Sequence, residues 1–318
     1  MRRSSVRTAA VLVLSFLCIH MAQSPSLGVV IRGGDGSGNT TAPPAPIGDP
    51  GWAQVGLRGV GSAIYLGNGW VLTANHVGLG DVTFDSTTYT AQPGTFHQLH
   101  DPSNASVMAD IGVFQLSSVP VGLQGVTISS AAPANGSTIT AIGYGYDRAT
   151  SSTRWYVDFD TAPNTWSETI FPAADVFADG FKNVATRTKR WGQNRIDASG
   201  IQVTSGSLAT SALQVDFALS NGGGSNEFQG IGGDSGGAFF YKNGSSWELA
   251  GMMVGVGLYS GQPWNPNTSA YTAVYGDLTY AADMSVYRNQ ILAIIPEPAT
   301  LSLLVLGGVA TLRRRNRR

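Results

Sequence analysis

The chain has 318 residues, of which 42% are apolar and 12% charged, with 41 glycines against a single cysteine. This composition favours a turn-rich β protein with an ample core, and it excludes a fold held together by disulfides. Residues 25–295 carry 11 basic and 19 acidic side chains, so the body of the protein is acidic although the whole chain is nearly neutral. An acidic body argues against nucleic acid as a partner.

The first 50 residues are predicted to lie outside the folded body. Three arginines precede an apolar run, 9–19, that is too short for an ordinary membrane span, so residues 1–24 are typical of a signal peptide. Cys18 lies inside this signal, and the mature protein is therefore expected to hold no thiol. Residues 25–50 are rich in Gly, Pro, Ser and Thr, and we expect them to form a flexible lead-in.

From residue 51 onward, short β-rich runs such as 62–66 and 69–73 alternate with Gly, Asn and Asp turns. No stretch carries a convincing long amphipathic helix, and no repeat has a fixed period. Many short strands at modest spacing predict a sandwich or barrel. A basic stretch, 187–195, holds four of the 11 basic residues of the body. It could bind an acidic substrate or a polysaccharide, and a solvated hairpin is the favoured alternative.

The most specific motif is Gly-Gly-Asp-Ser-Gly-Gly at residues 232–237. Glycines around one serine let the chain turn sharply, so that backbone N–H groups point to the place where an oxyanion forms. A serine hydroxyl is a weak nucleophile and needs a histidine base, for which His76, just after an apolar strand, is the candidate. Asp110 begins another apolar strand, where a carboxylate is costly to bury unless a partner such as an imidazole N–H pairs with it.

These three segments resemble the chymotrypsin/trypsin family in identity, order and context. TANHV around His76, ADIGVFQL around Asp110 and GGDSGG around Ser235 are similar to the family's three catalytic motifs. The resemblance implies an all-β fold of two six-stranded antiparallel β-barrels of the chymotrypsin type, with the active site between them. Residues 51–135 are expected to form the first barrel and residues 136–285 the second.

The resemblance also implies the roles of the site residues. Ser235 would attack the substrate carbonyl, His76 would carry the proton and Asp110 would orient the imidazole, while the N–H groups of Gly233 and Ser235 form the oxyanion hole. The implied activity is that of a serine endopeptidase with protein or peptide substrates and neither metal nor cofactor. An acyl hydrolase (esterase) with the same triad, and a non-catalytic cell-surface binding protein on the same fold, stay open.

The substrate pocket is assigned by alignment with the family. Gln229 falls six residues before the nucleophile, at the expected floor, and it has no charge to pair with Lys or Arg. Val254 and Val256 fall on the expected wall strand, where a branched side chain narrows the entrance. We therefore expect non-tryptic specificity for small or medium uncharged residues. Activation by a cut before Ile31, with the new N-terminus buried against Asp234 as in animal members, is left open.

Residues 286–318 are predicted to form a sorting and anchoring tail. Pro296-Glu297-Pro298, a mostly apolar stretch over 299–312 and a final arginine cluster resemble the PEP-CTERM tail of exopolysaccharide-producing Gram-negative bacteria. This resemblance implies transient contact with the inner membrane, processing by an exosortase-type sorting enzyme, and export to the cell envelope, cell surface or medium. An ordinary C-terminal membrane anchor is the alternative.

We expect the exported form to lack the arginine cluster at 313–318, because the tail resembles one that is removed during sorting. Mass spectrometry of the cell-surface form checks this, with the cytoplasmic precursor as the control that retains the cluster. An intact Arg318 on the surface form would contradict the prediction.

Overall fold

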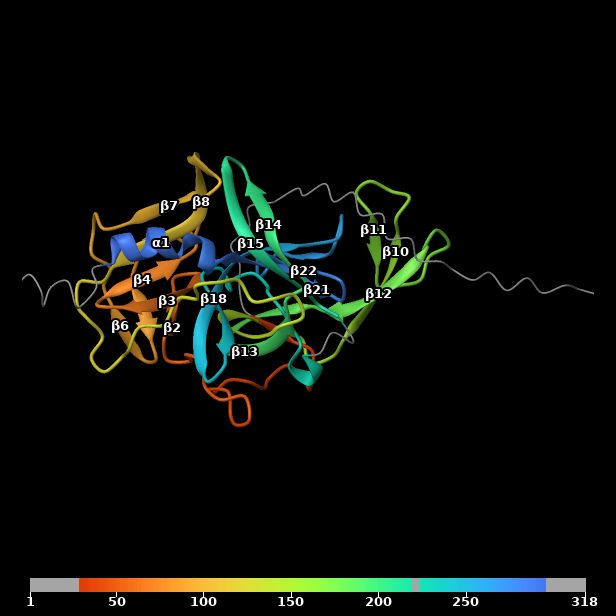
Figure 1. The fold of residues 1–318 in the computed structure, drawn as a ribbon. Helices are drawn as coiled ribbons and strands as arrows, with labels where there is room; N and C mark the ends of the chain where they lie inside the picture. The colour runs from red at the N-terminus through yellow and green to blue at the C-terminus, as the bar shows by residue number, and fades with distance from the viewer. Residues whose placement is uncertain (1–28, 219–222, 296–318) are drawn as a thin grey trace, which may run out of the picture.

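Two barrels of β-strands make up most of the computed structural model, which describes residues 29–218 and 223–295 (Figure 1). The predicted signal, 1–24, and the Pro-Glu-Pro motif at 296–298 lie outside the described residues. Within the two described ranges, no helix is long and apolar enough to cross a membrane.

The first barrel is built from the N-terminal half of the described chain. Its strands are β2 (Val55–Arg58), β3 (Gly61–Gly67), β4 (Trp70–Thr73), β5 (Val82–Phe84), β6 (Thr87–Tyr89) and β8 (Asn104–Gln115). They are hydrogen-bonded in the order β8-β4-β3-β2-β5-β6, and β7 (His97–Asp101) pairs with β8 beside this path. The barrel closes where Ala91, just after β6, bridges to Leu116 at the end of β8. Closure leaves no long unpaired edge.

The second barrel is built from the C-terminal half. Its strands are β9 (Thr138–Arg148), β13 (Asn183–Arg195), β15 (Leu208–Asp216), β17 (Ala238–Asn243), β18 (Ser246–Gly257) and β22 (Leu278–Asp283). They follow the order β13-β9-β17-β18-β22-β15. Asp197 closes the barrel, because its N–H donates to the Gln214 carbonyl (2.9 Å), and β14 (Ala198–Ser205) continues along β15. The predicted all-β architecture of two six-stranded antiparallel barrels is confirmed.

The continuous apolar runs of the first barrel belong to strands that are covered on both faces. In β3, Ala63 and Tyr65 pack in one buried cluster with Phe114, while Ile64 between them packs in another cluster with Leu72. Successive side chains of a strand point to opposite faces. Both faces of β3 are therefore buried, which explains why its sequence does not alternate between apolar and polar residues.

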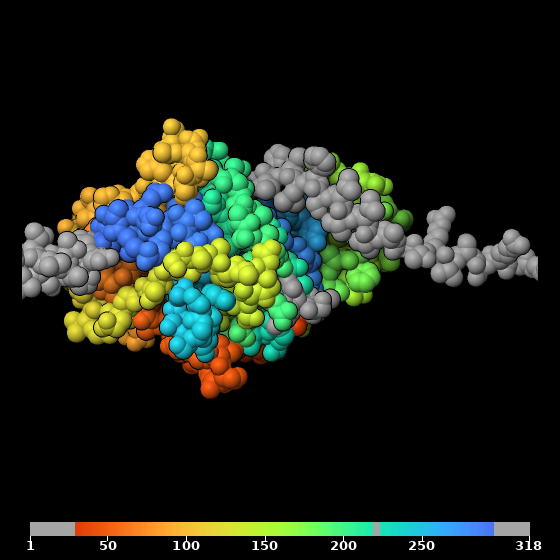
Figure 2. Space-filling view, in the orientation of Figure 1, coloured from red at the N-terminus to blue at the C-terminus, as the bar shows by residue number. Residues whose placement is uncertain are grey.

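The described chain ends in one helix, α1 (Met284–Ile294), which shows that the folded body extends beyond the predicted start of the tail at residue 286. Asp283 caps the helix by accepting the Ser285 N–H (3.0 Å). Its buried face carries Met284, Tyr287 and Ile291. The helix contacts β7 and β18, and Figure 2 shows it lying over the first barrel. A buried apolar face of this kind holds the segment in the body.

The predicted flexible lead-in, 25–50, is instead ordered from residue 29 onward. Its strand β1 (Val30–Ile31) is buried and pairs with β16 (Phe228–Gln229). Arg148 lies inside the turn that follows, where its Nε donates to the Ile31 carbonyl (2.7 Å) and its Nη2 to the Gly34 carbonyl (2.7 Å). These partners are more than 100 residues away, so the composition of the segment alone could not indicate its order.

Figure 1 shows a separate sheet to one side of the second barrel, and three of its four strands come from the part of the sequence between β9 and β13. It consists of β10 (Thr153–Asp158), β11 (Thr165–Ser167), β12 (Val176–Phe181) and β21 (Ala273–Val274). The remaining short elements are η1 (Gly224–Asn226), β19 (Trp264–Asn265) and β20 (Ala270–Tyr271).

The favoured interpretation of residues 187–195 as a solvated hairpin is wrong. The segment lies inside β13 and pairs along β9. Arg190 is buried against Asp147, with 2.9 Å between Nη2 and Oδ1, and the Lys189 amine donates to the Val55 carbonyl (2.6 Å). Burial lowers the pKa of Lys189 to about 7. Arg190 and Lys189 therefore act as hydrogen-bond donors inside the protein, where they satisfy a carboxylate and a carbonyl group.

We expect Arg148→Met to lower the free energy of unfolding by about 3 kcal/mol, because the buried Ile31 carbonyl and the partly buried carbonyls of Gly33 and Gly34 would lose their donor. Urea unfolding followed by tryptophan fluorescence measures this. Arg154→Met is the control, since that guanidinium pairs with Asp179 at the surface and its loss should have a much smaller effect. Equal effects of the two changes would contradict the prediction.

Candidate active site

His76, Asp110 and Ser235 lie together where the two barrels meet. His76 follows β4, Asp110 belongs to β8, and Ser235 lies in the loop before β17. The His76 Nε2 atom is 2.8 Å from Ser235 Oγ, and Nδ1 is 2.6 Å from Asp110 Oδ2. Because an ionised carboxylate can only accept, Nδ1 carries the proton and Nε2 is left to accept the serine hydroxyl. The three residues predicted from the sequence thus form one continuous chain of hydrogen bonds.

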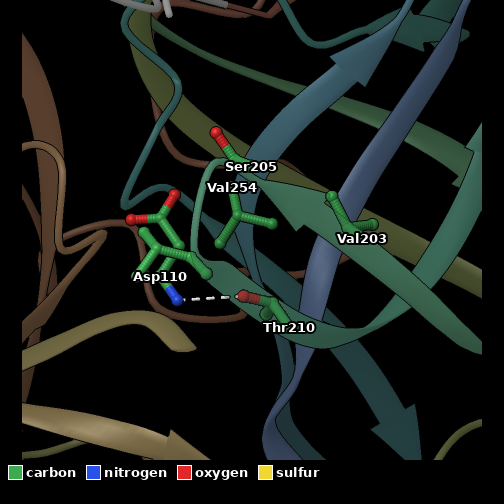
Figure 3. A pocket seen from close by; sticks show the side chains of 6 residues that line it. Asp110, Val203, Ser205, Thr210 and Val254 are labelled. Atoms are coloured by element: carbon green, nitrogen blue, oxygen red, sulfur yellow. Dashed lines mark hydrogen bonds between the residues drawn. The ribbon is translucent and has the colours of Figure 1, made fainter. Parts of the chain in front are cut away.

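Asp110 is nearly buried, and each of its carboxylate oxygens has a donor. Oδ1 accepts the backbone N–H of His76 (2.9 Å) in addition to the ring contact at Oδ2. Its own N–H donates to Thr210 Oγ1 of β15 (2.9 Å), as Figure 3 shows. A buried carboxylate is tolerated only with such partners. The second barrel therefore helps to hold an acid that belongs to the first.

A small cavity of about 10 Å³ lies beside Asp110 (Figure 3). It is lined by Asp110, Val203, Ser205, Leu208, Thr210 and Val254. A space of this size holds about one water molecule. Val254, predicted as a wall of the substrate pocket, is buried at this cavity, and Gln229 does not line it.

The loop around Ser235 needs glycine at two positions for steric reasons. Gly233 has φ +103° and Gly236 has φ +83°, both in the region that side chains disfavour. A Cβ on Gly236 would also lie 2.0 Å from the Ser62 carbonyl oxygen. The loop is fixed to β18, since the Gly236 N–H donates to the Met253 carbonyl (2.8 Å). The glycine density of the motif therefore reflects close backbone packing around the serine.

Asp234, next to the serine, is buried. Burial raises its pKa well above the usual range, while the N–H groups of Ile231 (3.0 Å to Oδ2) and Val29 and the charge of Arg187 oppose that rise. Ile31, before which an activating cut was left open, pairs with Phe228 in the uncut chain. In this form the backbone N–H of Val29 contacts Asp234.

Gln229, the predicted pocket floor, is also buried. Its Nε2 donates to the Leu278 carbonyl (3.0 Å), and its Oε1 has no hydrogen-bond partner among the described residues. The residue before Leu278 is Asp277, a buried acid that the sequence analysis did not predict to matter. Its carboxylate accepts a hydrogen bond from Gln262 Nε2 (2.8 Å). Burial raises the pKa of Asp277 to about 8, so at neutral pH it is mostly uncharged. Val256 is half-buried on β18, opposite Thr279.

Three buried hydroxyls around the candidate site were also missed by the sequence prediction: Ser62, Thr73 and Thr210. Ser62 and Thr73 interrupt otherwise apolar strands, and Thr210 supports Asp110. A polar side chain inside an apolar run needs a hydrogen-bond partner when the strand is buried. This rule could have indicated that the three hydroxyls are hydrogen-bonded, although it does not identify their partners.

One group of described side chains, Asp158, Asp160 and Asp175, could hold a metal ion, because their carboxylate oxygens lie within 4.8 Å of one another. Two of these acids already accept backbone N–H groups, as Asp158 does from Asp160 (2.9 Å). The group belongs to the separate sheet and its turns, and none of its members takes part in the hydrogen-bond chain of Ser235.

Residues 40–178, less than half of the chain, match the model of the family described as Trypsin. The matched segment contains His76 and Asp110 and ends before Ser235, and the chain thus carries a trypsin-like serine protease domain. No curated protein matches the chain.

Several solved protease structures are similar to the chain at low identity. Neuropsin from mouse brain is 16% identical over 80% of this chain and 97% of its own, with a TM-score of 0.43. The Rv3671c protease of M. tuberculosis, in an inactive form, is 12% identical over 81% and 99%, with a TM-score of 0.41. The NS6 protease of murine norovirus 1 is 14% identical over 76% and 94%, with a TM-score of 0.37.

We expect Asp277→Asn to stabilise the protein increasingly as the pH rises from about 5 to 8. The folded-state pKa of Asp277, about 8, is raised above the unfolded value, so its contribution to stability is present at low pH and is lost as the pH rises through 8. Asparagine is neutral throughout. The difference in unfolding free energy should grow by up to about 1.4 kcal/mol per pH unit. Urea unfolding at several pH values measures it, and a constant difference would contradict the prediction.

Proposed function

We propose that this chain is an exported serine endopeptidase that hydrolyses peptide bonds through an acyl-enzyme. The observation that carries the proposal is the continuous hydrogen-bond chain from Asp110 through His76 to Ser235. A peptidase function agrees with the trypsin-like domain that includes two of the three residues. Export rests on the predicted signal and tail, and it leads to a cell-envelope, cell-surface or extracellular location.

In the proposed reaction, Ser235 Oγ attacks the carbonyl carbon of the substrate while His76 Nε2 takes the hydroxyl proton. Asp110 stabilises the imidazolium that forms and keeps Nδ1 as the donor. The N–H groups of Gly233 and Ser235 stabilise the negative oxygen of the tetrahedral intermediate. His76 then gives its proton to the leaving amine as the C–N bond breaks, and water repeats the sequence to release Ser235.

An esterase with the same triad is the second candidate, because acyl transfer to serine is common to both reactions. A binding protein without turnover is less favoured, since the hydroxyl, the imidazole and the carboxylate are all at hydrogen-bond distance. The His76 imidazole lies between a buried acid and a hydroxyl and is about one-third exposed. Binding without turnover does not require this arrangement, whereas acyl transfer does.

We expect Ser235→Ala to fold like the wild type but to release no product from peptide substrates, because only the nucleophile is removed. A fluorophosphonate probe should label wild type on Ser235 and leave the variant unlabelled. Ser205→Ala, which changes a serine at the cavity beside Asp110, is the matched control and should label normally. Labelling without peptide cleavage, together with ester hydrolysis, would favour the esterase. Turnover by the Ser235 variant near the wild-type rate would contradict the triad.

We also expect the purified enzyme to prefer small or medium uncharged side chains before the scissile bond. Gln229 provides no charge, and the nearby Asp277 is mostly neutral below pH 8, so an incoming cation would be poorly compensated. Profiling at pH 7 on a peptide library measures the preference. A dominant preference for Lys or Arg would contradict this assignment of Gln229, Val254 and Val256 as the pocket.

A further inference from the structure

We propose that the hydroxyl of Ser62 is a positioning group for the nucleophile loop, residues 232–237, an inference that rests on the proposed function. Ser62 lies on β3 of the first barrel and is fully buried. Its Oγ donates to the Gly233 carbonyl (2.9 Å) and accepts the N–H of Tyr144 on β9 (3.0 Å). One hydroxyl therefore joins both barrels to the loop that carries the nucleophile.

The backbone of Ser62 holds the same loop at a second point. Its N–H donates to the Ser235 carbonyl (2.8 Å). Its own carbonyl accepts the hydroxyl of Thr73 (2.7 Å), which keeps β3 and β4 in register beside the loop. Residue 62 thus contacts the loop on both sides of Asp234, and the hydroxyl provides the contact nearer the start of the motif.

The Ser62 hydroxyl restricts a residue whose backbone is otherwise free to rotate, because Gly233 has no side chain. Its φ of +103° lies in a region open to glycine, which lacks the side chain that would restrict rotation. Gly233 also supplies one of the two proposed oxyanion donors. Donors stabilise a developing oxyanion only when they are fixed before the reaction, and a displacement of about 1 Å is costly. Anchoring the Gly233 carbonyl is a direct way to fix this residue.

The second barrel makes Ser62 a firm anchor. Tyr144, whose N–H donates to the Ser62 hydroxyl, is itself fixed by a second hydrogen bond. Arg187 Nη2 donates to the Tyr144 carbonyl (3.0 Å). The same Nη2 donates to the Val60 carbonyl (2.9 Å), just before β3. Because the Tyr144 N–H can only donate and the Gly233 carbonyl can only accept, the proton of the Ser62 hydroxyl points to Gly233.

The test compares Ser62→Ala with Ser129→Ala on the full protein. Removing one oxyanion donor costs about 10²- to 10³-fold in kcat, so misalignment of one donor should cost about 10- to 100-fold. We expect this loss in Ser62→Ala with little change in KM, and a parallel loss of affinity for a peptide trifluoromethyl ketone, which forms an oxyanion on the enzyme. Ser129 is equally buried and donates to the Ala131 carbonyl (2.8 Å), and its variant should keep wild-type values.

Wild-type kcat and inhibitor affinity in Ser62→Ala would overturn the proposal, as would an equal loss in Ser129→Ala. If Ser62→Ala does not fold, Ser62→Cys decides, because a thiol has a similar shape but is a weaker donor, and wild-type kcat in that variant would overturn the proposal.

Hydrogen exchange followed by mass spectrometry gives a readout that does not require turnover. The amides of residues 232–237 should exchange faster in Ser62→Ala and remain unchanged in Ser129→Ala, and unchanged exchange in both would overturn the inference. Absence of peptide cleavage by the wild type would instead contradict the proposed function, so the two failures are distinguishable.

Discussion

The candidate site depends on the cost of burying the carboxylate of Asp110. The acid is tolerated only because the backbone and ring of His76 both donate to it. Thr210 of the second barrel accepts its N–H, close to the point where β15 meets β8 at Leu208 and Met108. Satisfying the charge therefore orients the imidazole, while the backbone N–H of the same residue joins the first barrel to the second beside the site.

Much of this arrangement could be predicted from the sequence, because it follows from local chemistry. Short apolar runs between turn residues indicated the strands, and glycines around Ser235 indicated a sharp backbone turn with exposed N–H groups. The resemblance of three motifs to the chymotrypsin/trypsin family indicated which histidine and which acid belong with Ser235, in agreement with the need of a buried carboxylate for a partner. The structure brings all three residues together as that reasoning required.

The rest could not be predicted, because it depends on partners that are distant in the sequence. Residues 29–50 have the composition of a linker, yet Arg148 and β16 order them. Helix α1 is short, and its buried face is meaningful only against β7 and β18. Gln229 is assigned to the pocket by its distance from Ser235 along the chain and Val254 by alignment with the family, and neither method gives the direction in which a side chain points. The role of Ser62 could not be predicted for the same reason, because a serine in an apolar strand does not indicate which carbonyl its hydroxyl will bind.

The position of α1 has a consequence for the order in which the protein folds. The helix holds the last described residues, yet Gln290 exchanges two hydrogen bonds with the backbone of His100, nearly 200 residues earlier (3.0 Å each). Ile291 belongs to the same buried cluster as Ile64 of β3. During synthesis the first barrel emerges long before the helix that covers it, and the apolar surface beneath the helix stays exposed until residues 284–294 have been made. A nascent chain that has not reached these residues therefore presents an apolar surface that favours aggregation.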